Sequence, residues 1–125
     1  MENVGKILNK IILILIGILV FVNIFSIDYV NGDSMNPTLK SGDYVLTTNI
    51  GKIKDNDIVI VDTSKNDKFD SQKIIKRYIA NKSTDNEVWV EGDNVSVSYD
   101  SRFTGPVKRT DIESHMVLNI SGLFR

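Results

Sequence analysis

The sequence predicts a mainly β protein in which one N-terminal transmembrane helix precedes a small barrel-like domain. Residues 7–27 form a long apolar run near the start of a chain of 125 residues. After Asp28, short β-branched runs alternate with turns rich in Gly, Asn and Asp, and no long stretch repeats with a period of 3.6 residues. We therefore expect an anchor in residues 1–28 and one β domain in residues 29–125.

The first element is the run ILNKIILILIGILVFVNIFSI, residues 7–27. A helix of that length spans about 30 Å, the thickness of a bilayer core. Lys6 and Lys10 lie at its start, whereas Asp28 and Asp33 follow it, which favours a cytoplasmic N-terminus and an extracytoplasmic β domain. A cleaved signal peptide is the alternative, but VNIFSIDYV offers no small-x-small site. A soluble core helix would not be apolar on all sides.

The strands of the domain are predicted from β-branched and aromatic residues bounded by turn residues. The expected strands are DYVLTTNI (43–50), DIVIVDT (57–63), QKIIKRYIAN (72–81), NEVWVEG (86–92) and HMVLNIS (115–121).

Composition excludes several functions. The net charge is -1, so no nucleic-acid surface is expected. The chain has no cysteine and a single histidine, His115, so thiolate and histidine metal sites are excluded. The segment DTSKNDKFD lacks the glycine of a calcium loop and has Lys73 at the position of the bidentate acid. We expect no metal and no cofactor.

Ser34 lies in NGDSMNPTLKSGDYVL, directly after the apolar run. It is either an ordinary turn residue or a nucleophile on a rigid corner. Pro37 stiffens the chain beyond it, and Gly32 lets the backbone approach a substrate closely. Met35 offers apolar surface beside it.

A serine needs a base, and Lys76 is a candidate. In a strand over 72–81, Ile74, Lys76 and Tyr78 share one face, and Ile75, Arg77 and Ile79 share the other. A solvated lysine near pKa ~10.4 is neutral at pH 7 only at a cost of about 4.6 kcal/mol, and burial reduces that cost. A snorkelling Lys-Arg pair at a strand end is the alternative.

The third segment of interest is EGDNVSVSYDSRFTGPV, residues 91–107. Asp100 and Arg102 can form a charge pair that fixes a loop. Taken alone, this segment predicts a β-hairpin with polar side chains and no catalytic role.

Together the three segments resemble type I signal peptidases, which are membrane-anchored Ser-Lys proteases that include bacterial leader peptidases and mitochondrial inner-membrane proteases. Residues 32–39, GDSMNPTL, are similar to the nucleophile segment G-x-S-M-x-P-T-L. Lys76-Arg77 resembles the K-R pair of the general base. GDN at 92–94, with SYDSRFTG at 98–105, resembles the segment G-D-N…S-x-D-S-R-x-x-G.

The resemblance implies a catalytic role for Ser34 as nucleophile and for Lys76 as general base. It implies that the backbone N–H of Ser34 contributes to the oxyanion hole and that Ser98 orients the lysine. Asp100 and Arg102 would stabilise the surrounding loop, and Met35 would neighbour the substrate pocket.

The chain also departs from the family. Gly32 stands where some members carry a serine that completes the oxyanion hole, so the second donor is unassigned. The stretch between Lys76 and Gly92 is short, as in the pared-down members. Lys76 argues against the endoplasmic-reticulum branch, which uses histidine.

The resemblance predicts an extracytoplasmic catalytic domain that removes signal peptides from exported preproteins after small-x-small motifs. Its partners would be preproteins and the lipid bilayer, with pilus or secretion components as further partners. Phe69, Phe103 and Phe124 are candidates for an apolar rim at the lipid surface. The alternatives are a dedicated processing protease, such as one for a pilin, and a non-catalytic membrane-anchored assembly factor of the same fold. A membrane helix in place of a DNA-binding domain disfavours a self-cleaving repressor.

Overall fold

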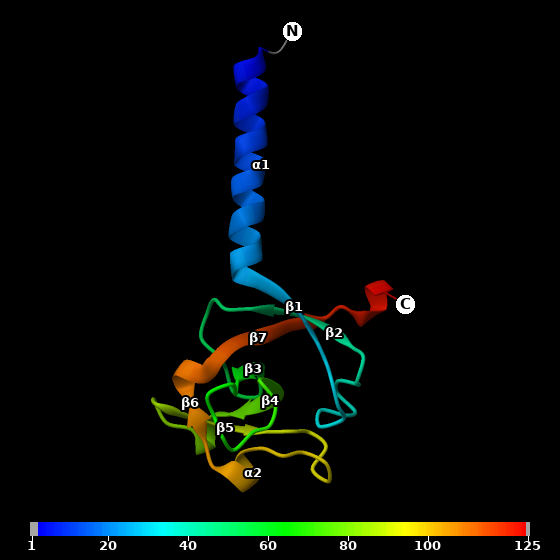
Figure 1. Cartoon of the computed structure of the whole chain (residues 1–125), viewed down its shortest axis with the longest axis vertical. Helices are drawn as coiled ribbons and strands as arrows, with labels where there is room; N and C mark the ends of the chain where they lie inside the picture. The colour runs from blue at the N-terminus through cyan, green and yellow to red at the C-terminus, as the bar shows by residue number, and fades with distance from the viewer. Residues whose placement is uncertain (1–2, 125) are drawn as a thin grey trace.

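The computed structural model describes residues 3–124. Its longest element is the helix α1, Val4–Ile24, which stands away from the rest of the chain (Figure 1). Asn3 caps the helix, because its side chain accepts a hydrogen bond of 3.0 Å from the backbone N–H of Lys6. No residue of α1 is buried against the domain, and the helix is long and apolar enough to cross a membrane.

The prediction of a helix as far as Ile27 is wrong at its C-terminal end. The helix stops at Ile24, and Phe25–Tyr29 form the strand β1, which pairs antiparallel with β2, Tyr44–Thr48. Phe25 lies opposite Thr48, and Tyr29 lies opposite Tyr44. Hydropathy does not separate a helix from a strand in a continuous apolar run, and here backbone pairing with a neighbouring strand decides the conformation.

The domain is one curled antiparallel sheet, a half-barrel, which confirms the mainly β fold (Figure 1). Its strand order is β1-β2-β7-β3-β4-β5-β6. The strands beyond β2 are β3 (Ile58–Asp62), β4 (Lys73–Ile79), β5 (Glu87–Glu91), β6 (Val107–Lys108) and β7 (Ile112–Asn119). A strand therefore lies within or across each of the five predicted segments, whereas β1 and β6 were not predicted.

Short helical turns join the strands. They are η1 (Ala80–Lys82), α2 (Ser101–Thr104), η2 (Arg109–Asp111) and η3 (Ser121–Phe124). Asp100 caps α2, since its side chain accepts a hydrogen bond from the backbone N–H of Arg102. This cap fixes the direction of the chain beside Asp100, which matters for the site.

Two apolar clusters hold the sheet together. The first contains Val59, Val61, Phe69, Tyr78, Val88, Val90 and Val107. The second contains Val30, Met35, Leu39, Val45 and Ile58. Met35 and Leu39 are completely or almost completely buried, and burying each such side chain stabilises the fold by about 1.5–3 kcal/mol. The second cluster therefore anchors the segment that carries Ser34 onto β2 and β3.

Candidate active site

A cleft with a volume of about 590 Å³ lies between two parts of the chain. One wall runs from Asp28 in β1 to Ser34, and the other runs from Phe69 to Lys76 in β4. Ser34 and Lys76 both line this cleft, although many residues separate them in the sequence. The fold therefore brings the predicted nucleophile and the predicted base to one site.

Ser34 is half-buried and is held by its backbone. Its carbonyl oxygen accepts a hydrogen bond of 2.8 Å from the backbone N–H of Asn94, and the Asn94 side chain donates to the carbonyl of Asp33 at 3.1 Å. Gly32 has a φ of 99°, which an L-residue with a side chain rarely adopts, so the turn before Ser34 favours glycine. Within residues 3–124 the Ser34 hydroxyl makes no hydrogen bond and faces the cleft unengaged.

Lys76 is buried, with 4% of its surface exposed. The expected alternation in β4 is confirmed, because Lys76 and Tyr78 turn inward while Arg77 is half-buried on the other face. Burial lowers the pKa of the Lys76 amine, and the nearby Arg102 lowers it further, whereas Asp100 opposes the change. A lowered pKa increases the neutral, basic form of the amine near neutral pH.

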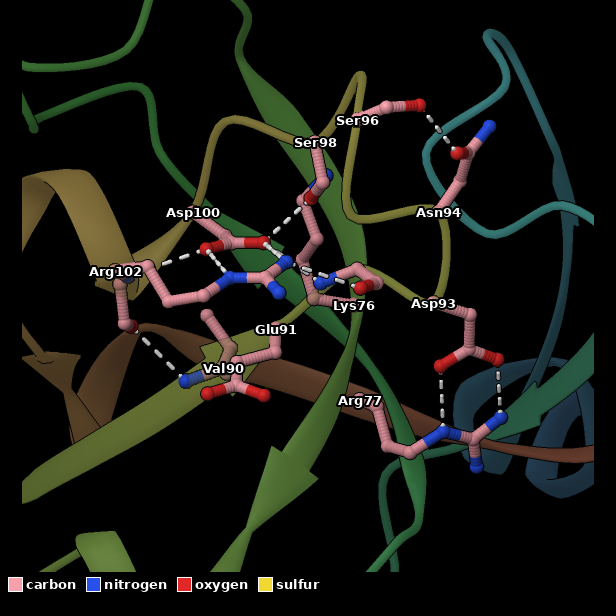
Figure 2. A network of polar contacts seen from close by, with 12 residues as sticks. Lys76, Arg77, Val90, Glu91, Asp93, Asn94, Ser96, Ser98, Asp100 and Arg102 are labelled. Carbon is pink, nitrogen blue, oxygen red and sulfur yellow. Dashed lines mark hydrogen bonds and ion pairs between the residues drawn. The ribbon is translucent and has the colours of Figure 1, made fainter.

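Ser98 connects Lys76 to a carboxylate (Figure 2). The Lys76 Nζ donates to Ser98 Oγ at 3.2 Å, and Ser98 Oγ in turn donates to Asp100 Oδ2. Because Ser98 gives its proton to Asp100, its oxygen is left as an acceptor for the amine. This orientation fixes where the Lys76 nitrogen points. Among the described residues no direct hydrogen bond joins Lys76 to Ser34.

Asp100 is the most completely satisfied charge at the site. Arg102 donates to it from Nε at 3.0 Å and from Nη2 at 2.6 Å, and the Gly92 backbone N–H donates at 2.8 Å. The predicted Asp100–Arg102 pair is therefore present. Burial tends to raise the pKa of Asp100, but hydrogen bonds from Arg102, Gly92 and Ser98 outweigh it and lower the pKa to about 2.

Gly92 lies next to the segments that carry Ser34, Ser98 and Asp100. A Cβ at this position would come within 2.1 Å of Ser98 Oγ and 2.7 Å of the Ser34 carbonyl oxygen. No side chain fits there without moving one of these groups. Gly92 thus allows the segments that carry Ser34 and Ser98 to approach each other.

A second polar network was not predicted. Asp93 accepts a bidentate pair from Arg77, at 2.8 Å from Nε and 2.6 Å from Nη2 (Figure 2). It also accepts a hydrogen bond of 2.6 Å from Thr38 Oγ1. The bonds from Arg77, more than that from Thr38, lower the pKa of Asp93 despite its partial burial. The network ties β4, beside Lys76, to the segment that follows Ser34. The only sequence signal was the adjacency of Arg77 to Lys76 and of Asp93 to Gly92.

The other predicted residues fall into two groups. Gly32 lines the cleft, whereas Ser98, Asp100 and Arg102 stand behind Lys76. Met35 is fully buried, so it supports Ser34 from beneath and presents no apolar surface to the cleft. Pro37 is exposed and follows a cis peptide bond after Asn36, away from the cleft lining.

Further expectations concern residues other than Ser34 and Lys76. His115 lies on β7 and does not line the cleft. Phe69 is a member of the first apolar cluster, so its assignment to a lipid-facing rim is wrong; its ring fills the core instead. Phe103 is exposed, and the side chain of Phe124 lies outside the described part of the structure. Within residues 3–124, no group of three or more His, Asp or Glu side chains could hold a metal ion.

Comparison with known protein families identifies the family of the chain. The family described as signal peptidase, peptidase S26, matches residues 4–82 and 81–120. The match spans most of the chain, and the protein therefore belongs to the peptidase S26 signal peptidase family. A comparison with curated proteins finds no significant match.

Proposed function

We propose that this protein is a membrane-bound serine endopeptidase that cleaves signal peptides from exported preproteins after small-x-small motifs. The observation that carries the proposal is a buried Lys76 amine with a lowered pKa, in the same cleft as an unengaged Ser34 hydroxyl. Membership of the family supports the same activity.

The reaction follows from these two groups. The neutral Lys76 amine removes the proton of Ser34 Oγ, and the oxygen attacks the carbonyl carbon of the scissile peptide bond. The Ser34 backbone N–H has no hydrogen-bond partner within the described chain, so it is available to stabilise the oxyanion. Lys76 then gives its proton to the leaving amine, which departs and leaves an acyl ester on Ser34. Lys76 then takes a proton from a water, and the resulting hydroxide attacks the ester carbonyl. The bond to Ser34 Oγ breaks, Lys76 returns the proton to that oxygen, and the signal peptide leaves with a free carboxylate.

The cleft suits a peptide in extended conformation. Within residues 3–124, β1 pairs with β2 alone, and in β4 only Arg77–Ile79 pair with β5, which leaves one edge of β1 and of the first half of β4 unpaired. Residues of both unpaired edges line the cleft. A substrate strand would hydrogen-bond these backbones, as in other cases of strand addition. Ile60, Ile74 and Ile75 line the cleft and would contact small apolar side chains.

The proposal places the helix in the cell membrane as a single pass with its N-terminus in the cytoplasm. Lys6 and Lys10 precede the apolar stretch, whereas the carboxylates follow it. A preprotein that is held in the same membrane meets the cleft at high effective concentration. Exported preproteins and the bilayer are thus the partners, with pilus or secretion components as additional ones.

The direct test compares variants of the full chain on a small-x-small preprotein reporter. Ser34→Ala and Lys76→Ala should each abolish cleavage, since each removes one partner of the proton transfer. His115→Ala should leave cleavage largely intact, because His115 does not line the cleft. Cleavage at the original rate by the Lys76 variant would show that another group is the base.

A narrower function is favoured by one observation. Only η1 and a short turn separate β4 from β5, so the domain is compact beside Lys76. This suits a dedicated processing protease with one or few substrates, such as a pilin. Incubating the anchored protein with the cell's own exported precursors, with and without Ser34, separates a broad peptidase from a dedicated one and from a non-catalytic assembly factor.

A further inference from the structure

An exposed row of apolar side chains lies directly beside the cleft. Inward-facing Ser98 and Asp100 alternate with outward-facing neighbours in the segment before α2. We define the apolar strip as the outward residues Val95, Val97 and Tyr99 of this segment together with Phe103 of α2. Their exposed fractions are 67%, 58%, 51% and 70%. Contiguous apolar patches on a protein surface often mark binding sites, whereas single exposed apolar residues are common. The apolar strip is therefore a candidate binding site.

The aromatic part of the strip is organised before anything binds. The Tyr99 ring packs edge-on against Phe69, with a centroid distance of 5.6 Å, and stacks on Phe103 at 5.9 Å. Phe69 is itself buried in the first apolar cluster. The strip is thus attached to the core, and little side-chain entropy remains to be lost on binding.

The strip is continuous with the cleft. Val97 and Tyr99 line it together with Ser34 and Lys76. A chain that occupies the cleft therefore meets the strip without a break. A lipid bilayer is the alternative apolar partner of the strip. However, α2, which carries Phe103, lies at the end of the molecule opposite the membrane helix α1, and this disfavours the bilayer (Figure 1).

We propose that the apolar strip is a substrate subsite that binds an apolar or aromatic side chain downstream of the cut. This inference rests on the proposed function. The substrate's membrane segment precedes the cut, so its upstream residues lie toward α1 and β1. Its downstream residues lead away from the membrane, in the direction of α2 (Figure 1). Precursors with a large apolar residue soon after the cleavage site are thus the preferred substrate class.

The experiment uses the full chain in detergent and in vesicles of neutral phospholipid. Two peptides share the same residues up to the cut, and after it one carries Leu and Phe where the other carries Ser and Asn. The wild type should cleave the apolar peptide with a kcat/KM about tenfold higher, mostly through KM, as expected for burying one large apolar side chain. Phe103→Ser and Val97→Ser should remove most of that preference. Leu123→Ser, a change at a residue that is 80% exposed and outside the cleft, should keep it.

Binding of the labelled peptides to the Ser34→Ala protein separates this inference from the chemistry. Tighter binding of the apolar peptide, reduced in the Phe103→Ser background, supports the subsite even if no peptide is cut, a result that would overturn only the proposed function. Equal handling of both peptides in cleavage and binding overturns the subsite. A preference unchanged in both strip variants also overturns it. The subsite is also overturned if the strip variants lose cleavage of both peptides equally and only in vesicles. That result would identify the bilayer as the occupant of the strip.

Discussion

The Lys76 amine determines how the proposed activity depends on pH. Burial lowers its pKa below the ordinary lysine value of 10.5. As pH rises through the pKa of the folded protein, Lys76 loses its proton and gains the ability to accept one from Ser34. We predict that kcat/KM rises with pH and that the midpoint of this limb lies below 10.5. A pH profile on a reporter peptide measures it, and a midpoint at or above the ordinary value would contradict the role of burial.

Asp100 links the site to acid stability. Its pKa falls from 3.8 to about 2 on folding, so the ionised carboxylate stabilises the protein above pH 4, and this stability is lost as pH falls toward 2. The shift corresponds to about 2 kcal/mol. The difference in free energy of unfolding between wild type and Asp100→Asn should therefore shrink by about that amount between pH 7 and pH 2.

Denaturant titrations followed by Trp89 fluorescence in detergent measure this difference. Asp67→Asn is the matched control, because Asp67 is exposed and does not line the cleft. A difference for Asp100→Asn that stays constant with pH would show that its carboxylate is not held ionised by its neighbours.

Gly92 is the residue with the least steric tolerance at the site. In Gly92→Ala the new methyl group overlaps Ser98 Oγ and crowds the Ser34 carbonyl, so these segments must separate. We expect a destabilisation of about 1–3 kcal/mol and a loss of cleavage. Gly122→Ala is the control, since nothing lies within 4 Å of its added methyl group. Near-wild-type cleavage by Gly92→Ala would mean that the approach of the two segments is not needed.

Among the elements, β4 has two roles, because Lys76 faces inward while Arg77 binds Asp93 on the other side. The Arg77–Asp93–Thr38 network holds the segment that follows Ser34 against this strand. Asp93→Ala should cost about 1–2 kcal/mol of stability and should lower kcat more than it raises KM, because Ser34 moves relative to Lys76.

The control for Asp93→Ala removes a longer and more exposed ion pair. Lys82 pairs with Glu91 at 3.1 Å, and its side chain is half-exposed, so Lys82→Gln should change both stability and kcat little. Thr38→Val removes one bond of the network and should give an intermediate kcat. A rise in KM alone for Asp93→Ala, with kcat unchanged, would indicate a role in substrate binding instead of positioning.

The sequence predicted those strands whose own residues show a clear local pattern. The alternation in 72–81 indicated that a cation would face the core, and the structure identifies it as Lys76. β1 was missed because its apolar residues continue the run of the helix, and β6 because Val107–Lys108 is too short to show a pattern. The convergence at Gly92 and the Arg77–Asp93–Thr38 network depend on distances between segments far apart in sequence, which no local pattern encodes.

The orientation of the whole molecule in the membrane can be tested because the chain contains no cysteine. Single cysteines then report which side of the membrane they occupy. Lys65→Cys, in an exposed loop of the domain, should react with a membrane-impermeant maleimide in intact cells. Lys6→Cys, at the start of α1, should react only after lysis. The reverse pattern would place the cleft in the cytoplasm.

The absence of a linker between α1 and the sheet has a mechanical consequence. The helix ends at Ile24, β1 begins at Phe25, and Asp28 and Tyr29 of the same strand already border the cleft. A strand of this length rises about 17 Å, so the distance between the end of α1 and the cleft is set by the backbone itself. In the proposed function, the protein would therefore cut a membrane-held chain at a fixed distance from the membrane edge. Inserting Gly-Ser pairs between Ile24 and Phe25 should shift the preferred cut site outward or blur it.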